Sequence, residues 1–350
     1  MKTRVTELFG IKYPIMLSGM SGISEPKIVA AVSNAGGLGV LGTGTMTAVE
    51  AKKAIREAKE LTDKPFGINV SLLFPGAAEN AKIGLEEKVH VINFSLGKGD
   101  WIVEAAHKYG GKVIATVVNS RHAKRAQDYG CDGLVVTGHE AAAHGGDATS
   151  LVLIPSIVDE VDIPLIAAGG FADGRGLMAA LALGAEGIAM GTRFMTTQES
   201  PLHEKYKQLS IEKGVSDTIY GKYFDGLGCR SMKTKVSEKA YKRGFLGLPN
   251  FPAAIINARG LANILDFPYY KLFIGIILSG WKNAKQMAYM ANAFPAIQAA
   301  IEDGDSENKG VLPVGQSTGL IHEVPTVAEL LEKIAIEAEQ AQKKLSDAAK

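Results

Sequence analysis

Eight short apolar runs that alternate with longer helical patterns, from the start to about residue 215, predict a closed (β/α)8 barrel. The runs are apolar almost throughout, which is typical of parallel strands covered by helices on both sides. A barrel of this kind needs about 250 residues. An open doubly wound sheet would need a G-x-G-x-x-G fingerprint after its first strand, where this chain reads SGMSGIS instead.

The predicted strands can be read in chain order. They are PIMLS (14–18), LGVLG (38–42), FGINV (66–70), VHVIN (89–93), KVIAT (112–116), DGLVV (132–136), PLIAAG (164–169) and EGIAMG (186–191). Helical stretches such as EPKIVAAVSNAGG and AVEAKKAIREAKELT lie between them, with apolar residues at helical spacing in the second and charge on its other face. The glycines of NAGG and LGAEG supply helix ends before the next strand.

The β/α alternation breaks off at about Ile219 and does not return before Asn308. We therefore predict two parts: a barrel from residues 1–218 and 309–350, and a mainly helical lid or substrate domain from residues 219–308 over the C-terminal ends of the barrel strands. The barrel resumes at GVLPVGQSTGLI and closes with the helix VAELLEKIAIEAEQAQKKL. The most apolar stretch, LFIGIILSGW (272–281), is about half the length of a membrane span, which predicts a buried or ligand-covering helix.

Composition and charge narrow the function classes. The chain has 38 basic and 37 acidic residues, a net charge of +1, and no basic stripe that would indicate nucleic acid. Its two cysteines, Cys131 and Cys229, are too few for a disulfide framework and lack metal-ligand spacing. The N-terminal MKTRVTELFGIKYP has no apolar signal core, so we expect a cytoplasmic location. We also expect a small-molecule substrate, no bound metal and no membrane span.

Glycines follow the seventh and eighth predicted strands, in AAGGFADGRG (167–176) and MGTRF (190–194). Barrels commonly bind a phosphate between these two loops, where backbone N–H groups approach it with a helix N-terminus behind them. The predicted phosphate-site residues are Gly169, Gly170, Gly191 and Thr192. The alternative, that these glycines only permit tight turns, stays open.

A phosphate-bearing cofactor without a dinucleotide fingerprint indicates flavin mononucleotide, FMN. Ser18, Gly19 and Met20 end the first strand with small residues that let backbone amides approach a flat ring. Asn69 ends the third strand, where its amide can bond a ring edge or cap the turn. Lys124 follows the fifth strand and can balance the cofactor's negative charge or be solvated.

The loop TGHEAAAHGG (137–146) carries the candidate acid–base residue. His144 follows the sixth strand, flanked by small residues, and histidine has the pKa that a general base needs. Glu140 can hold the loop, bind a ligand hydroxyl or be solvated, and His139 has no assigned role. We predict His144 as the catalytic residue.

Together these features resemble the nitronate monooxygenase (2-nitropropane dioxygenase) family of FMN-dependent barrels, which includes enoyl-ACP reductase II and NADH:quinone reductase branches. The resemblance covers nearly all of residues 1–215 and again about 300–335. It lies in MKTRVTELFGIKYPIMLSGM, AAVSNAGGLGVLG, LTDKPFGINVSLL, IPLIAAGGFADGRGLMAALALGAEGIAMGTRFMTTQES and EDGDSENKGVLPVGQSTGLI.

The resemblance implies FMN contacts at Ser18 to Met20, Asn69, Lys124, Gly169, Gly170, Gly191 and Thr192, and it makes His144 the active-site histidine. Glu140 is also predicted to bind the cofactor. In the nitronate-oxidising branch this histidine takes a proton from the carbon next to the nitro group. In the reductase branches, NADH or NADPH supplies the electrons for an enoyl thioester or a quinone.

The chain departs from the family in two places. The usual E-A-G-G-H-x-G loop reads EAAAHGG, so Ala142 and Ala143 replace glycines and should narrow the pocket. The apolar lid suits an acyl chain or quinone, although buried structure or a homodimer contact explains it equally well. Three hypotheses remain: nitronate monooxygenase first, NAD(P)H-dependent enoyl-thioester or quinone reductase second, and a non-redox phosphate-ligand-binding barrel third.

Overall fold

The computed structural model describes residues 1–350 apart from 75, 143, 243–247, 265–268 and 271–279. Eight parallel strands form its central sheet, in the order β1-β8-β7-β6-β5-β4-β3-β2. These strands are β1 (Ile15–Leu17), β2 (Gly39–Gly42), β3 (Phe66–Ser71), β4 (Val91–Ser95), β5 (Lys112–Val117), β6 (Gly133–Thr137), β7 (Leu165–Ala168) and β8 (Gly187–Met190). The predicted (β/α)8 barrel is confirmed, with each strand within two residues of its expected limits.

The barrel closes between β1 and β2. Leu17 N–H donates to the carbonyl of Leu38 at 2.9 Å, and Leu38 N–H donates to the carbonyl of Ile15 at 2.9 Å. Met16 and Leu38 accordingly form a parallel bridge. This closure leaves no open sheet edge in the barrel.

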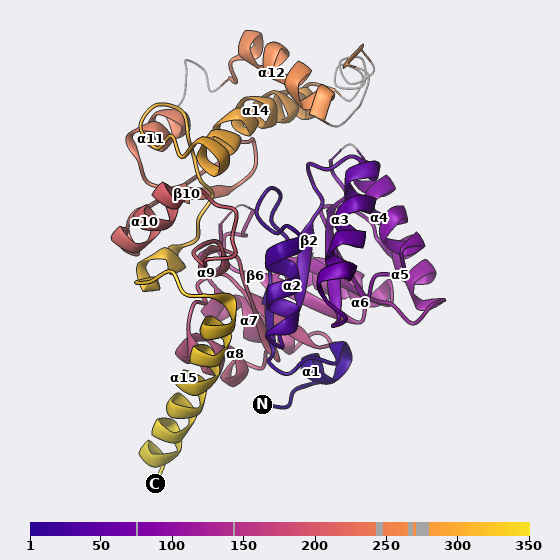
Figure 1. Cartoon of the computed structure of the whole chain (residues 1–350), viewed down its shortest axis with the longest axis vertical. Helices are drawn as coiled ribbons and strands as arrows, with labels where there is room; N and C mark the ends of the chain where they lie inside the picture. The colour runs from indigo at the N-terminus through magenta and orange to yellow at the C-terminus, as the bar shows by residue number, and fades with distance from the viewer. Residues whose placement is uncertain (75, 143, 243–247, 265–268, 271–279) are drawn as a thin grey trace.

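Helices surround the barrel (Figure 1). The helices of the β/α units are α2 (Pro26–Asn34), α3 (Ala48–Leu61), α4 (Ala77–Glu86), α5 (Asp100–His107), α6 (Ser120–Asp128), α7 (Ser150–Val158), α8 (Gly174–Ala182) and the short α9 (Thr192–Met195). The C-terminal helix α15 (Val327–Ala348) packs against α8 and α2, so the chain after the insertion returns to the barrel wall.

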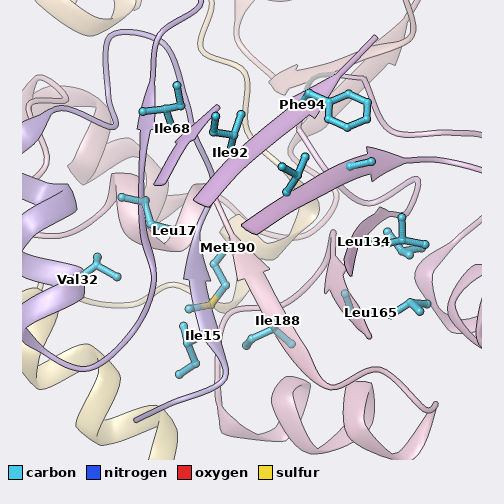
Figure 2. Close-up of a cluster of buried hydrophobic side chains, with 14 of the residues drawn as sticks. Ile15, Leu17, Val32, Ile68, Ile92, Phe94, Leu134, Leu165, Ile188 and Met190 are labelled. Carbon is cyan, nitrogen blue, oxygen red and sulfur yellow. The ribbon is translucent and has the colours of Figure 1, made fainter. Parts of the chain in front are cut away.

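Strand side chains alternate between two apolar layers. On β1, Ile15 and Leu17 belong to the outer cluster under the helices, whereas Met16 belongs to a separate cluster inside the barrel. Figure 2 shows the outer layer, to which most of the strands contribute side chains. Helix α1 (Arg4–Phe9) adds Val5 and Phe9 to the inner cluster and thereby closes the N-terminal end.

The insertion begins with a β-hairpin that the helical prediction for residues 219–308 did not include. Strands β9 (Thr218–Gly221) and β10 (Cys229–Met232) pair antiparallel, after α10 (Glu204–Glu212). Helices follow in α11 (Lys235–Tyr241), α12 (Phe251–Ile264), α14 (Trp281–Gln298) and the single turn η2 (Ala299–Asp303). Figure 1 shows α11, α12 and α14 at the end of the molecule opposite α1, which is the side to which the strand C-termini point.

The predicted helix at LFIGIILSGW falls largely on residues 271–279, outside the described residues. Its last residue, Trp281, begins α14 and is exposed. Within the described part of the chain, no helix has the length and apolar character that crossing a membrane requires.

Candidate active site

A cavity of about 590 Å³ opens at the C-terminal ends of the barrel strands. Nine of the eleven predicted site residues line it. They are Ser18, Gly19, Met20, Asn69, His144, Gly169, Gly170, Gly191 and Thr192. Lys124 and Glu140 do not, and the structure gives both of them other partners.

The loop after β7 presents bare backbone to the cavity. Gly169 and Gly170 have φ angles of +98° and +87°, in the left-handed region that glycine tolerates best. A Cβ on Gly169 would also lie 3.1 Å from the amide nitrogen of Ala141. Both glycines are therefore required by the backbone path itself.

The helix behind this loop does not offer a free N-terminus. The Asp173 carboxylate accepts from Gly176 N–H at 2.9 Å, and the Glu337 carboxylate of α15 accepts from Gly174 N–H at 3.0 Å. Acidic side chains thus accept the hydrogen bonds of these two backbone N–H groups in the first turn of α8. The short helix α9, which begins directly after Gly191, supplies the helix start at the cavity.

Thr192 ties the end of the barrel to the returning chain. Its buried hydroxyl accepts from Gly315 N–H at 2.9 Å, and Gln316 N–H donates to the carbonyl of Glu140 at 2.9 Å. Through these bonds Gly315, the N-cap of the 3-10 helix η3 (Gln316–Leu320), and Ser317 within that helix line the cavity. The segment GQSTGL (315–320) was part of the family resemblance, but none of its residues was predicted to belong to the site.

The turn after β1 is held in place by hydrogen bonds. The hydroxyl of Ser24 accepts from Met20 N–H at 3.0 Å and donates to the carbonyl of Ser18 at 2.7 Å. The amide of Asn69 donates to the carbonyl of Gly19 at 3.2 Å, and a Cβ on Gly19 would lie 2.3 Å from the Asn69 Cβ. Asn69 therefore supports this turn as well as lining the cavity.

A set of inward polar side chains near the strand ends was missed by the sequence analysis. Thr116 donates from its hydroxyl to the Asn93 side-chain oxygen at 3.0 Å, and the hydroxyls of Ser71 and Ser95 lie 3.0 Å apart. All four line the cavity, as does Thr137. The available signal was a polar residue at the last inward positions of an otherwise apolar strand, because strand side chains alternate with a period of two.

Lys124, which was predicted to balance the cofactor's charge, does not line the cavity. Its ammonium group pairs with the Glu160 carboxylate at 2.9 Å, away from the cavity. The face of α6 that lines the cavity carries His122, Arg125 and Tyr129, spaced three and four residues apart. Lys124 lies on another face, because each helical residue turns by about 100°.

Glu140 holds the loop and does not line the cavity, so the structure does not place it with the other predicted cofactor-binding residues. Its carboxylate accepts from Ser150 N–H at 2.9 and 3.1 Å and from the Ser150 hydroxyl at 3.1 Å. The same hydroxyl donates to the carbonyl of Gly169 at 2.8 Å. Glu140 thus places a negative charge at the N-terminus of α7, where the helix dipole favours it, and links that helix to the β7 loop.

His144 lines the cavity and has a partner that the sequence analysis did not foresee. Its Nε2 lies 2.7 Å from Oδ2 of Asp225, in the loop between β9 and β10. The two residues are 81 positions apart, so no local motif joins them. Ala142 also lines the cavity without a left-handed φ, and Ala143 lies outside the described residues.

The described residues contain no group of histidine, cysteine and acidic side chains that could hold a metal ion. The cavity places an imidazole beside a carboxylate, a pair that can transfer a proton. This pair lies near glycine loops whose backbone N–H groups can bind a phosphate.

Comparison with known proteins supplies the family. The family model described as nitronate monooxygenase matches residues 2–84 and 77–337. A Rhodococcus jostii (strain RHA1) protein, (3aS,4S,5R,7aS)-5-hydroxy-7a-methyl-1-oxo-octahydro-1H-indene-4-carboxyl-CoA dehydrogenase, is 35% identical over 341 residues, covering 97% of this chain and 96% of that protein. A probable nitronate monooxygenase of Staphylococcus aureus (strain JH9) is 30% identical over 298 residues, covering 72% and 83%.

A solved structure resembles the chain over its whole length. FabK from Thermotoga maritima superposes with a TM-score of 0.83 at 34% identity, covering 99% of both chains. The insertion is therefore included in the match to FabK, and most of it in the match to the dehydrogenase.

Proposed function

Because the chain belongs to the nitronate monooxygenase family of oxidoreductases, we propose that it binds FMN in the barrel cavity and acts on an acyl thioester. The observation that carries this proposal is the cavity itself, because Gly169, Gly170 and Gly191 line the same cavity as His144. Family membership argues against the non-redox barrel.

The residues present fit FMN. The two left-handed glycines and the start of α9 offer backbone N–H groups to a phosphate, and the polar side chains of Asn93 and Thr116 offer partners to a ring edge. FMN, when bound, supplies two-electron redox chemistry. His144 then moves the proton that accompanies the electrons at the substrate carbon.

Two observations support an acyl-thioester substrate: the nearly full-length match to a CoA dehydrogenase, and positively charged side chains on the cavity lining. The relatives that match over nearly the full length include a CoA dehydrogenase, whose match covers 97% of this chain against 72% for the Staphylococcus aureus protein. Lys98 and Arg125 are exposed cations on the cavity lining, where they suit a phosphate-bearing carrier such as CoA. The His122 imidazole is not counted among these cations, because burial and the positive charges of Arg121 and Arg125 lower its pKa.

Nitronate oxidation is the second candidate. The matching family model and the Staphylococcus aureus relative carry that activity in their names. A neutral nitroalkane needs a base to remove a proton from the carbon next to the nitro group, and His144 beside a carboxylate suits that role.

Anaerobic mixing of the FMN-loaded protein with single compounds separates the candidates. We expect the flavin absorbance to bleach with NADH or NADPH and to return on addition of crotonyl-CoA or dodecenoyl-CoA, or to bleach directly with a saturated or hydroxylated acyl-CoA. Free CoA is the control and should do neither. Bleaching by propyl nitronate alone would establish the second candidate, and a chain that takes up no FMN would refute both.

The expected cytoplasmic location and homodimer stay predictions. Cell fractionation and light scattering of the FMN-loaded protein test them.

A further inference from the structure

The β9–β10 hairpin contacts both flanks of the loop that carries His144. On one side, the Arg230 guanidinium donates to the carbonyl of His139 at 3.1 and 3.3 Å and to the Thr218 hydroxyl at 2.9 Å. On the other side, the Tyr220 hydroxyl lies 3.5 Å from the carbonyl of Gly145, and its ring meets the His139 ring edge-to-face at 4.5 Å. Arg230 is only 5% exposed, so this contact is a buried anchor.

The tip of the hairpin is anchored independently. Buried Phe224 stacks on Tyr241 of α11, with ring centroids 5.5 Å apart and planes 9° apart. Gly226 has a φ of +88°, and a Cβ there would lie 3.1 Å from Cγ of Gln286 in α14. Asp225, between these two anchors, is thus positioned by the hairpin and by the helices of the insertion together.

The Asp225 carboxylate is aimed at the imidazole of His144. One oxygen lies 2.7 Å from Nε2, and the other accepts from Leu227 N–H at 3.0 Å. Because a carboxylate only accepts, the proton of the neutral imidazole resides on Nε2 and the lone pair on Nδ1. The side chains are 28% and 13% exposed, so solvent screens the pair only in part.

We propose that Asp225 is a positioning residue for proton transfer by His144, so that the insertion completes a site that the barrel alone does not hold. The carboxylate selects one tautomer, fixes the ring orientation and stabilises the imidazolium form once the ring has taken up a proton. This inference rests on the proposed role of His144 and not on which substrate is used.

Other ionisable groups near the loop have different partners. His139 bonds the carbonyl of Gly146 through Nδ1 at 2.9 Å, and Glu140 accepts from Ser150. On the hairpin, burial followed by the negative charge of Asp147 raises the pKa of Tyr220. Among the described residues, Asp225 is the acidic side chain that pairs with His144.

The test is Asp225→Asn, which keeps the side-chain shape and removes the charge. Nitrogen NMR of ¹⁵N-histidine-labelled, FMN-loaded protein reports the tautomer of His144, whose signals are assigned by their loss in His144→Gln. We expect the wild-type neutral ring to carry its proton on Nε2. In Asp225→Asn we expect a mixture of the two tautomers, because the asparagine amide can donate to Nε2 as well as accept from it.

Turnover of crotonyl-CoA with NADH gives the second readout. We expect kcat to fall by about 10- to 100-fold with little change in KM, part of the gain that general acid–base catalysis provides. In a His144→Gln background the same change at Asp225 should have no further effect. If the protein turns over neither crotonyl-CoA nor a saturated or hydroxylated acyl-CoA, the proposed function fails, and the NMR result still decides the role of Asp225.

Two further variants complete the design. Glu238→Gln removes an exposed carboxylate of α11, paired with Lys233 at 3.8 Å, and should leave the His144 signals unchanged. Gly226→Ala shifts the hairpin tip without changing its chemistry and should change the tautomer signals of His144 in the same direction as Asp225→Asn. Identical His144 signals in the wild type, Asp225→Asn and Gly226→Ala would overturn the proposal, as would an equal shift in Glu238→Gln.

Discussion

Replacing Gly170 with alanine tests whether the β7 loop binds the FMN phosphate. Gly170 has a φ of +87°, and an added Cβ would meet the Glu140 Cβ at 3.5 Å, an ordinary contact. The expected cost is therefore conformational and not steric. Gly110 offers a matched control, because its φ is +82°, nothing lies within 4 Å of its added Cβ, and it is not part of the cavity lining.

The two variants should lose stability alike and differ in FMN affinity. An L-residue in the left-handed region costs about 1–2 kcal/mol, so both apoproteins should unfold more easily by that amount. In Gly170→Ala, relaxation of this strain turns the backbone N–H groups away from the phosphate. One lost hydrogen bond to a charged group costs about 1.5–3 kcal/mol, which corresponds to about 10- to 150-fold weaker FMN binding.

Urea unfolding of the apoproteins measures the first quantity, and titration of FMN followed by its fluorescence measures the second. We expect Gly110→Ala to bind FMN as the wild type does. Unchanged FMN affinity in Gly170→Ala would refute the phosphate site at this loop. Equal weakening in both variants would show that general destabilisation, and not the loop, controls binding.

Three other outcomes check the corrected and buried residues. Lys124→Ala should leave the FMN dissociation constant unchanged, since its exposed pair with Glu160 is worth only about 0–1 kcal/mol; a large loss of affinity would return Lys124 to the site. Glu140→Gln should lower the free energy of unfolding by about 1–3 kcal/mol, because Ser150 at the start of α7 loses a charged acceptor; urea unfolding of the apoprotein measures this, and an unchanged midpoint would contradict it. Cys131 should resist iodoacetamide at about pH 8 in the native state, because burial raises its pKa to about 12 and the thiol stays protonated below that pH; rapid alkylation seen by mass spectrometry would be the opposite result.

The barrel was predictable because its signals are local. Each strand is a short apolar run bounded by glycine or polar residues, and each helix has its own periodicity and end signal, as in α3, where Thr47 and Glu50 form a capping box. The hairpin β9–β10 was not predictable in this way. Its strands are four residues long and contain Tyr220 and Arg230, which contact a loop 75 and 91 residues earlier in the chain.

The site residues likewise fall into those that local sequence predicts and those that depend on tertiary packing. Glycines at strand ends, such as Gly169 and Gly170, are visible in the sequence because the backbone geometry they permit is a property of the residue itself. Lys124 was assigned by its position after a strand, but which face of α6 points into the cavity depends on how the helix packs. Glu140 could not be separated from a ligand residue until Ser150 was seen to take up its carboxylate.

Periodicity, backbone freedom and side-chain chemistry are local properties, so the residues alone predict the barrel, the glycine loops at its mouth and the histidine beside them. The partner of His144 came from the folded chain, because a hydrogen bond between side chains 81 positions apart depends on the docking of the hairpin. The tertiary structure also decided that Gly315 and Ser317 join the cavity, since the return of the chain to Thr192 is a long-range contact.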